Sequence, residues 1–311
     1  MQAPQATLAI DAGQSGIKFR YRDPDQVAEW AVGGIRTDLP LAPQLSQVMV
    51  NALAGRTVAT VGIGSSGFAE GTIDAADLLA AAAPFGATQL RLAHDSITAY
   101  LGALGDARGA VTAAGTGVVT LAVGANEVTR VDGWGYLIGD AGSGYWIGAQ
   151  ALTEAMRQFD GRSQPTGLLE MLRRDFVDPT MAYLDLQSDE GKVGRIAAYA
   201  REVAELAEHD SAARNILERA GAALAESAIA GLRVVGELSS PAPQVCGVGA
   251  VFGSSLVRDA FEAAVRAQVP AAQVTIGESH PLDGAERLLA VSGDSALLPH
   301  IAHASRPQQA A

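Results

Sequence analysis

The stretch that decides the fold runs from Leu92 to Gly124 and reads LAHDSITAYLGALGDARGAVTAAGTGVVTLAVG. It predicts a strand that ends at His94-Asp95, a helix over 96–104, and two strands within 110–123 around a glycine turn. A carboxylate at a strand end, near a glycine turn between two strands, suits an acid–base residue that faces a phosphate. The alternative is that Asp95 caps a helix and that Gly115-Thr116-Gly117 only turns a hairpin.

Composition excludes several classes of protein. The 311 residues are 48% hydrophobic and 18% charged, which is typical of a folded chain with room for two domains. A net charge of −12 argues against nucleic-acid and membrane-surface binding, although a nucleotide site needs only backbone amides and one or two cations. Cys246 is the single cysteine, and no apolar run reaches membrane-spanning length, so we expect a cytoplasmic protein.

The N-terminus carries a strand, a tight turn over 11–16 and a second strand. Backbone N–H groups and the side chains of Gln14 and Ser15 can hold phosphate oxygens there, and Gly13 lets the backbone come close. Asp11 could hold a hydrated Mg²⁺, and Lys18 could add a cation. By itself this pattern is more often an ordinary hairpin than a phosphate site. Because the same pattern recurs at Gly115–Gly117, it favours two related halves that face one phosphate chain.

A second group of candidates follows an apolar strand over 57–63, which ends in Gly64-Ser65-Ser66-Gly67. Open α/β sheets place ligands at the carboxyl ends of such strands. Farther along, the segment 133–148 reads GWGYLIGDAGSGYWIG, with Trp134 and Asp140 among its glycines. Aromatic faces beside exposed backbone and one carboxylate suit a sugar; the alternative is a surface loop whose aromatic side chains reach the core.

The rest of the chain is predicted to be largely helical, with helices over 145–158, 193–207 and 212–235. The three glutamates Glu202, Glu205 and Glu208 read as a solvated helix face. A glycine-rich strand-to-helix turn over 247–255 offers a helix N-terminus to a polar ligand. We therefore predict an N-terminal lobe over 1–108, a C-terminal lobe with helical additions over 109–302, and a flexible tail over 303–311.

With these pieces in order, the sequence resembles the superfamily of two-domain ATPases that includes actin and the sugar kinases. Within it, the chain is most similar to the N-acetylglucosamine kinase-like branch that contains the BadF/BadG/BcrA/BcrD ATPases. IDAGQSGIK looks like the first phosphate motif, AAGTGVV the second and VCGVGAVFGSS the adenosine motif. GWGYLIGDAGSGYWIG looks like the amino-sugar kinases of this branch, most of all glucosamine kinases of the actinobacterial type.

The resemblance implies an α/β fold of two actin-like (ribonuclease H-like) lobes with a nucleotide and sugar cleft between them. It implies a kinase that uses ATP and Mg²⁺ to make glucosamine 6-phosphate, with Asp95 as general base and Asp11 as the Mg²⁺ site through water. A homodimer is also expected. The implied sugar contacts are Asp38, Ser66, Gly67, Asp95, Trp134, Gly135 and Asp140. The implied nucleotide contacts are Gly13, Gln14, Ser15, Lys18, Gly115, Thr116, Gly117, Gly247, Gly249 and Phe252.

Two departures from the resemblance affect the choice of substrate and the base. Asp38 falls where N-acetylglucosamine kinases tend to carry Asn, and an extra carboxylate would favour a sugar with a free ammonium, although Asp140 could equally meet the amine. Glucosamine is therefore expected ahead of N-acetylglucosamine. His94 precedes the proposed base where relatives often carry Asn, and it is either a partner of Asp95 or a packed histidine.

Three other functions remain to be compared with this hypothesis. An activator ATPase that delivers electrons from an iron–sulfur cluster needs four thiolates, two from each subunit, and this chain has only Cys246. A sugar sensor without catalysis would have no need of Asp11 and Asp95, which are both present. Another sugar, such as glucose or a muramic acid derivative, would depend on the shape of the pocket.

Overall fold

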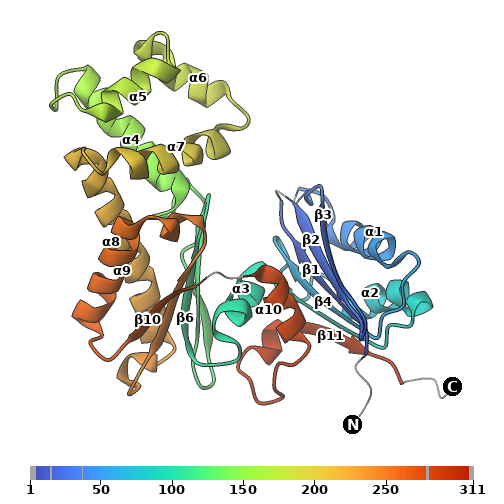
Figure 1. The fold of residues 1–311 in the computed structure, drawn as a ribbon. Helices are drawn as coiled ribbons and strands as arrows, with labels where there is room; N and C mark the ends of the chain where they lie inside the picture. The colour runs from blue at the N-terminus through green and yellow to red at the C-terminus, as the bar shows by residue number, and fades with distance from the viewer. Residues whose placement is uncertain (1–4, 15, 37, 278–279, 308–311) are drawn as a thin grey trace. The chain divides into compact units, whose positions relative to one another are not determined.

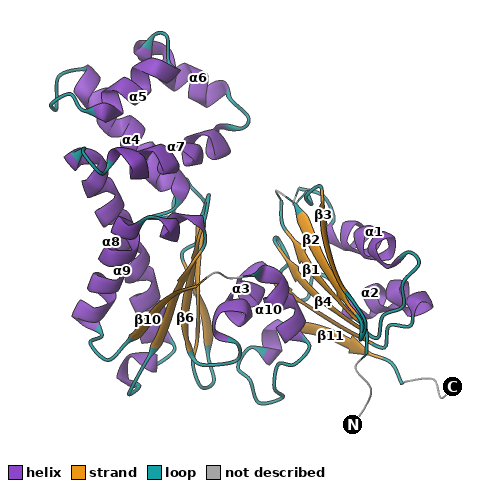
Figure 2. Cartoon of the chain, viewed as in Figure 1, coloured by secondary structure: helices purple, strands orange, loops and turns teal. Residues whose placement is uncertain are grey.

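The computed structural model describes residues 5–14, 16–36, 38–277 and 280–307. The chain forms two compact units, each containing one sheet and its own helices (Figures 1 and 2). The first unit contains Met1–Ala107, Ala125–Val128 and Ser279–Ala311, and the second contains Arg108–Gly124 and Thr129–Glu278. We describe each unit by itself.

The first unit is built on a six-stranded sheet in the order β11-β5-β4-β1-β2-β3. The strands β1, β4 and β5 are mutually parallel, whereas β2, β3 and β11 pair antiparallel with their neighbours. The strands are β1 (Thr7–Ala12), β2 (Ile17–Arg22), β3 (Val27–Val32), β4 (Thr60–Ser65), β5 (Gln89–His94) and β11 (Ala302–Ser305). The α-helices are α1 (Leu41–Leu53), α2 (Ala75–Ala82), α3 (Asp95–Leu104) and α10 (Pro281–Leu288).

Side chains that alternate along β1 pack against helices on both faces of this sheet. Leu8 and Ile10 are fully buried in the larger core, which α1 and α2 complete on one face. Ala9 points the other way and packs with Leu282 and Ala285 of α10. Because successive side chains of a strand point to opposite faces, a sheet covered on both sides needs an apolar residue at every position. Leu8, Ala9 and Ile10 in the middle of β1 meet this requirement, because all three are fully buried.

The second unit is built on a five-stranded sheet in the order β10-β9-β6-β7-β8. Its strands are β6 (Gly109–Ala114), β7 (Val118–Val123), β8 (Val128–Val131), β9 (Gln244–Val248) and β10 (Gln273–Gly277). The long helix α8 packs on β6 and β7 and against α9, while α5, α6 and α7 form a helical addition around α4 (Figure 1). The α-helices are α4 (Gly144–Phe159), α5 (Gly167–Asp175), α6 (Ala182–Ser188), α7 (Lys192–Leu206), α8 (Ser211–Val234) and α9 (Ser255–Gln268).

The two sheets repeat one topology. In each unit a hairpin of three strands is followed by two further strands on the other side of the first, which gives the order third, second, first, fourth, fifth. In both, the first strand pairs antiparallel with the second and parallel with the fourth. The prediction of two related α/β halves, each opened by a strand–turn–strand motif, is confirmed by this repeat.

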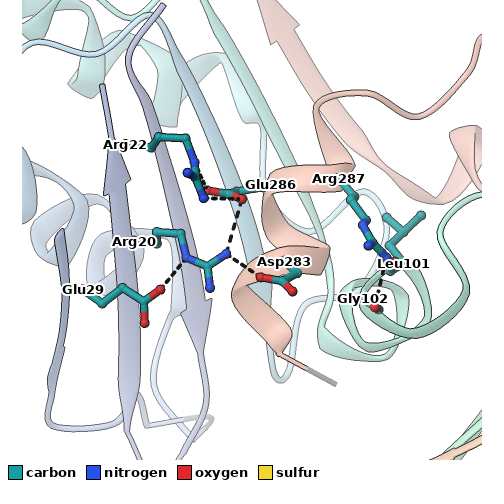
Figure 3. Close-up of polar contacts among 8 residues, drawn as sticks. All are labelled: Arg20, Arg22, Glu29, Leu101, Gly102, Asp283, Glu286 and Arg287. Carbon is teal, nitrogen blue, oxygen red and sulfur yellow. Dashed lines mark hydrogen bonds and ion pairs between the residues drawn. The ribbon is translucent and has the colours of Figure 1, made fainter. Parts of the chain in front are cut away.

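The C-terminal segment does not stay with the second unit, in contrast to the expected 109–302 lobe. Helix α10 packs on the first sheet, where Arg20 of β2 pairs with Asp283 and with Glu286 at 3.3 Å (Figure 3). Arg287 donates to the carbonyl oxygens of Leu101 (2.6 Å) and Gly102 at the end of α3. These contacts are between residues about 185 to 265 positions apart, which is why local sequence patterns do not indicate them.

The flexible tail expected over 303–311 is also wrong for its first residues. Strand β11 pairs antiparallel with β5, with His303 opposite Arg91 and Ser305 opposite Gln89. Ala302 and Ala304 pack against the core of the first unit. Because β5 would otherwise be an open edge, pairing with β11 satisfies its backbone groups. Residues 308–311 lie outside the described part of the chain.

Candidate functional site

Asp95 lies at the carboxyl end of the parallel strands, as the first residue of α3 directly after β5. Ser66 follows the neighbouring strand β4, and its backbone N–H donates to Ala12 at the end of β1 (3.0 Å). The hydroxyl of Ser66 donates to one carboxylate oxygen of Asp95. Gly67 continues this loop with φ +75°, a backbone conformation that favours glycine. Two of the predicted sugar residues are therefore in direct contact.

The carboxylate of Asp95 is subject to opposing effects. Burial by itself would raise its pKa, but hydrogen bonds and charge from His94, followed by the Ser66 hydroxyl, hold the pKa below its ordinary value. His94 Nδ1 lies 2.9 Å from Asp95 Oδ1. Asp95 is thus ionised at neutral pH, as a general base requires.

Asp11 behaves in the opposite way. It lies at the end of β1, opposite Lys18 in the β1–β2 hairpin and beside Gly64 of β4. Burial raises the pKa of Asp11 to about 6; Lys18 counteracts this and Asp95 adds to it. A desolvated carboxylate next to a second one is a position where a cation is favourable. Within the described residues, no group of three or more His, Cys, Asp or Glu side chains could hold a metal ion.

The turn after β1, predicted to bind phosphate, is closed by backbone hydrogen bonds. Gly13 N–H donates to Gly16 (3.0 Å), and Ile35 N–H donates to the carbonyl of Gly13 (3.0 Å). A Cβ on Gly34 would lie 1.9 Å from the carbonyl oxygen of Gln14, so only glycine fits there. Gln14 and Lys18 are exposed, and Ser15, predicted to contact phosphate, lies outside the described residues.

Asp38 is already paired. Its carboxylate receives two hydrogen bonds from the Arg36 guanidinium, Nε to Oδ1 at 3.1 Å and NH2 to Oδ2 at 2.6 Å, and that guanidinium holds the pKa of Asp38 below its usual value. Both side chains are mostly exposed. Gln44 of α1 fixes this segment, because it accepts from the N–H of Arg36 and donates to three carbonyl oxygens of residues 36–40. Asp38 is therefore not an unpaired carboxylate that would favour a substrate with a free ammonium group.

The second unit contains a cavity of about 920 Å³. Gly115 and Thr116 of the second glycine turn line one side of it, next to Gly144 at the start of α4. Gly144 N–H donates to Gly115 (2.8 Å) and Tyr145 N–H to Thr116 (3.0 Å), so the turn is joined to the helix N-terminus. Gly117 closes the turn by accepting from Gly115 N–H (2.8 Å). The predicted phosphate turn therefore opens into a space large enough for a nucleoside.

The opposite wall of this cavity was missed by sequence reasoning. Arg201 and Glu205 of α7 line it, together with Glu208, which follows the helix, and Arg214 of α8. The three glutamates were interpreted as a solvated face; Glu205 and Glu208 are exposed, but both also line this cavity. A usable signal existed in the four small residues of α7 that also line it: Ala197, Ala198, Ala200 and Ala204.

The predicted adenosine motif lies at the cavity, but the three residues expected to contact the nucleoside do not line it. Phe252 is 2% exposed, and its ring meets Phe261 edge-to-face at 5.0 Å, so it belongs to the core. A Cβ on Gly247 would lie 2.6 Å from the ring of Phe252, and Gly249 has φ +101°. The cavity is instead lined by residues of the turn that these three support, among them Ala250, Val251 and Gly253. Phe252 and the two glycines shape the wall from behind.

The aromatic and glycine-rich loop of the second unit is organised by Asp132, which sequence reasoning did not identify. Its carboxylate accepts the backbone N–H groups of Gly133 (2.7 Å), Asp140 (2.7 Å) and Ala141 (3.0 Å). Trp134 is 55% exposed under the guanidinium of Arg130, and Gly135 has φ +84°. A signal was available: an Asp directly before a Gly is the kind of residue that turns hold by side-chain hydrogen bonds.

Asp140 connects this loop to the glycine turn at Gly115–Gly117. Asp140 is 9% exposed and has φ +60°. Its carboxylate packs against Gly117, because a Cβ on Gly117 would lie only 2.7 Å from Asp140 Oδ2. Burial and the nearby Asp132 raise its pKa, while hydrogen bonds from the backbone N–H of Val118 and Gly135 work against that rise. Much of its hydrogen-bonding capacity is therefore used within the protein.

The predicted residues are divided between the units. The first unit holds Asp11, Gly13, Gln14, Lys18, Asp38, Ser66, Gly67 and Asp95, and the second holds Gly115, Thr116, Gly117, Trp134, Gly135, Asp140, Gly247, Gly249 and Phe252. The first unit therefore has a carboxylate beside a glycine hairpin, and the second has a cavity of about 920 Å³ beside another glycine hairpin. No helix in the described part of the chain is both long and apolar enough to span a membrane.

The chain belongs to the BadF/BadG/BcrA/BcrD ATPase family, whose model matches residues 37–286. Among curated proteins, it is 34% identical over 106 residues to the N-acetylmuramic acid/N-acetylglucosamine kinase of Clostridium acetobutylicum. That match spans 33% of this chain and 31% of the relative.

Solved structures share the fold. A candidate N-acetylglucosamine kinase from Chromobacterium violaceum superposes with a TM-score of 0.69 at 24% identity, covering 94% of this chain and all of that one. A second, from Porphyromonas gingivalis, reaches 0.69 at 15% identity and covers 90% and 98% of the two chains. The expected pair of actin-like lobes is confirmed by these likenesses.

Proposed function

We propose that the protein is an ATP-dependent amino-sugar kinase that phosphorylates the 6-hydroxyl of its substrate, with Asp95 as general base. The observation that carries this proposal is the ionised Asp95 carboxylate, bound by Ser66 at the carboxyl ends of parallel strands and next to the turn of Gly13. Open α/β sheets bind ligands at this edge.

The reaction follows from these positions. Asp95 accepts the proton of the sugar hydroxyl, whose oxygen forms a bond to the γ-phosphorus. The bond from that phosphorus to the bridging oxygen breaks, and ADP leaves with the electron pair. The Thr116 and Gly117 amides of the second glycine turn would bind phosphate oxygens, and the adjoining cavity of about 920 Å³ would take the nucleoside.

A divalent cation fits the residues present. Mg²⁺ keeps several waters and commonly takes one or two carboxylates plus phosphate oxygens, and it would neutralise phosphate charge in this reaction. Asp11 is suited to hold it through water, because its carboxylate is desolvated and lies within the field of Asp95. The lack of a three-ligand cluster among described residues agrees with a metal held mainly by the nucleotide.

The choice of amino sugar shifts when the contacts are considered. Glucosamine was expected because of an unpaired carboxylate, but Asp38 is engaged by Arg36 and Asp140 by backbone amides. A sugar without a free ammonium therefore suits the surroundings of Asp38 and Asp140 better. The names of the curated relative and of the similar structures also favour N-acetylglucosamine. We favour N-acetylglucosamine, with glucosamine as the alternative that Asp140 would support.

The activator ATPase is the main rival within this family. It would need at least two cluster thiolates from each subunit, and the single Cys246 is buried in β9. The predicted homodimer stays a prediction, as does the cytoplasmic location.

The role of Asp95 is tested by Asp95→Asn. We expect phosphorylation of N-acetylglucosamine to fall by about 10²-fold or more, since general-base assistance contributes about that much. Sugar binding, measured by calorimetry, should change little because the amide keeps the shape of the carboxylate. Asp74→Asn is the matched control, since Asp74 only caps α2 and Asn caps equally well. An Asp95→Asn enzyme with normal turnover would remove Asp95 from this role.

A further inference from the structure

His94 presents a single ring nitrogen to three polar groups. Nδ1 lies 2.9 Å from Asp95 Oδ1, 2.9 Å from the Ser96 hydroxyl and 3.2 Å from the Ser96 backbone nitrogen. Nδ1 lies close enough to the Ser96 N–H to accept a hydrogen bond from it as the N-cap of α3. The same atom lies close enough to the Asp95 carboxylate to donate a hydrogen bond to it.

One nitrogen cannot do both at once. An Nδ1 that accepts the Ser96 N–H carries a lone pair, and that lone pair would face the negative oxygen of Asp95. An Nδ1 that carries a proton donates to Asp95 and gives up the cap. The Ser96 N–H need not be lost in the second case, because the Asp95 carboxylate also receives a hydrogen bond from it.

The remaining contacts of Asp95 favour the second arrangement. Its other oxygen accepts the Ser66 hydroxyl, so a donor at His94 would leave the carboxylate held from both sides. The charged groups that act on Asp95 include His94 and, through space, Asp11 of β1. The neighbouring strand β4 places Ser65 beside His94 in register, and serine does not titrate.

We propose that His94 is a positioning residue for the phosphoryl transfer, one that donates from Nδ1 to Asp95 and so keeps the base ionised and oriented toward the sugar. The proposal rests on the proposed role of Asp95. Burial opposes ionisation of Asp95, and His94 is the largest of the groups that offset this. The competing view is that His94 is a helix cap and no more.

His94→Asn separates the two views. Asn is among the best N-cap residues, so the start of α3 should be preserved. A capping Asn places its oxygen where Nδ1 was, and its NH₂ group then points away from Asp95. The variant therefore keeps the cap and loses the donor. His300→Asn is the matched control, because His300 pairs with Glu70 on the surface of the same unit.

The first measurement is kcat/KM for the sugar between pH 5 and pH 9. For His94→Asn we expect unchanged thermal stability and an acidic limb moved to higher pH, so that kcat/KM at pH 5 falls several-fold while the plateau and the sugar KM change little. The sign follows from the pKa of Asp95, which His94 lowers and burial would raise. His300→Asn should keep the wild-type profile. Superimposable profiles for His94→Asn and the wild type would overturn the proposal.

A second measurement does not depend on activity. With ¹³C-labelled aspartate, the Asp95 carboxyl signal, assigned by its loss in Asp95→Asn, should titrate at higher pH in His94→Asn than in the wild type. An unchanged titration would show that His94 only caps the helix. If the protein phosphorylates no sugar but this shift is seen, the proposed function fails and the His94–Asp95 link stands.

Discussion

Asp11 and Asp95 are two carboxylates of the same unit whose surroundings act in opposite directions. Burial dominates at Asp11 and raises its pKa to about 6, whereas His94 and Ser66 outweigh burial at Asp95. Such a difference supports the separate roles proposed for the pair, Asp95 as an ionised base and Asp11 as a carboxylate that gains from a nearby cation.

Asp11→Asn tests this at the residue scale. The raised pKa means that ionising Asp11 destabilises the folded state, a cost that is absent below about pH 4 and complete above pH 6. Removing the charge should stabilise the ligand-free protein at pH 7.5, by up to about 3 kcal/mol from the size of the shift, and should not do so at pH 4. Activity should fall by about 10- to 100-fold and need more Mg²⁺.

Thermal unfolding at the two pH values measures the effect. Asp38→Asn is the control, because Asp38 is exposed and paired with Arg36, so its loss should change stability little. A variant at Asp11 that is no more stable than the wild type at pH 7.5 would show that the carboxylate is not strained by burial.

At the scale of elements, helix α10 controls the position of α3. Gly284 approaches α3 so closely that a Cβ would lie 1.7 Å from the carbonyl oxygen of Thr98. Gly284→Ala should destabilise the protein by about 1–3 kcal/mol or more, since overpacking forces the helices apart. Because α3 begins with Asp95, kcat should fall although Gly284 contacts no substrate. Gly293→Ala is the control, with open space around the glycine. Equal unfolding temperatures for the two variants would contradict this account of α10.

The wall of the cavity gives a second test at this scale. Ala204 of α7 lines the cavity, whereas Ala222 of α8 is exposed. Ala204→Phe should fill part of the nucleoside space and raise the KM for ATP, with the KM for the sugar nearly unchanged. Ala222→Phe should leave both constants as they are. Initial-rate kinetics with each substrate varied in turn separate these outcomes, and an unaltered KM for ATP in Ala204→Phe would mean that the nucleoside binds elsewhere.

Local patterns predicted most elements because each leaves a short-range signal. The hairpins around Gly13 and Gly115, the apolar strand before Ser66 and the helix after Asp95 are all visible as periodicity and turn residues. Contacts between distant segments leave no such signal. The pairing of β11 with β5, the return of α10 to the first sheet and the burial of Phe252 all depend on contacts of this kind.

For the whole molecule, the repeated sheet order explains how one chain has two glycine turns, each after the first strand of a sheet. Each unit has a glycine turn after its first strand. The first unit adds the hydrogen-bonded pair Ser66 and Asp95, and the second adds the cavity lined by α7. The proposed reaction needs both sets of residues to act on one pair of substrates.

The most direct measurement is ADP release from Mg-ATP with N-acetylglucosamine, glucosamine, glucose or no sugar, with the mass of each product determined. We predict ADP release that depends on an amino sugar and a product heavier by one phosphate, fastest with N-acetylglucosamine. A preference for glucosamine would support the Asp140 alternative and keep the kinase. Release of ADP at the same rate without sugar, and with no phosphorylated sugar, would contradict the proposal that this protein is an amino-sugar kinase.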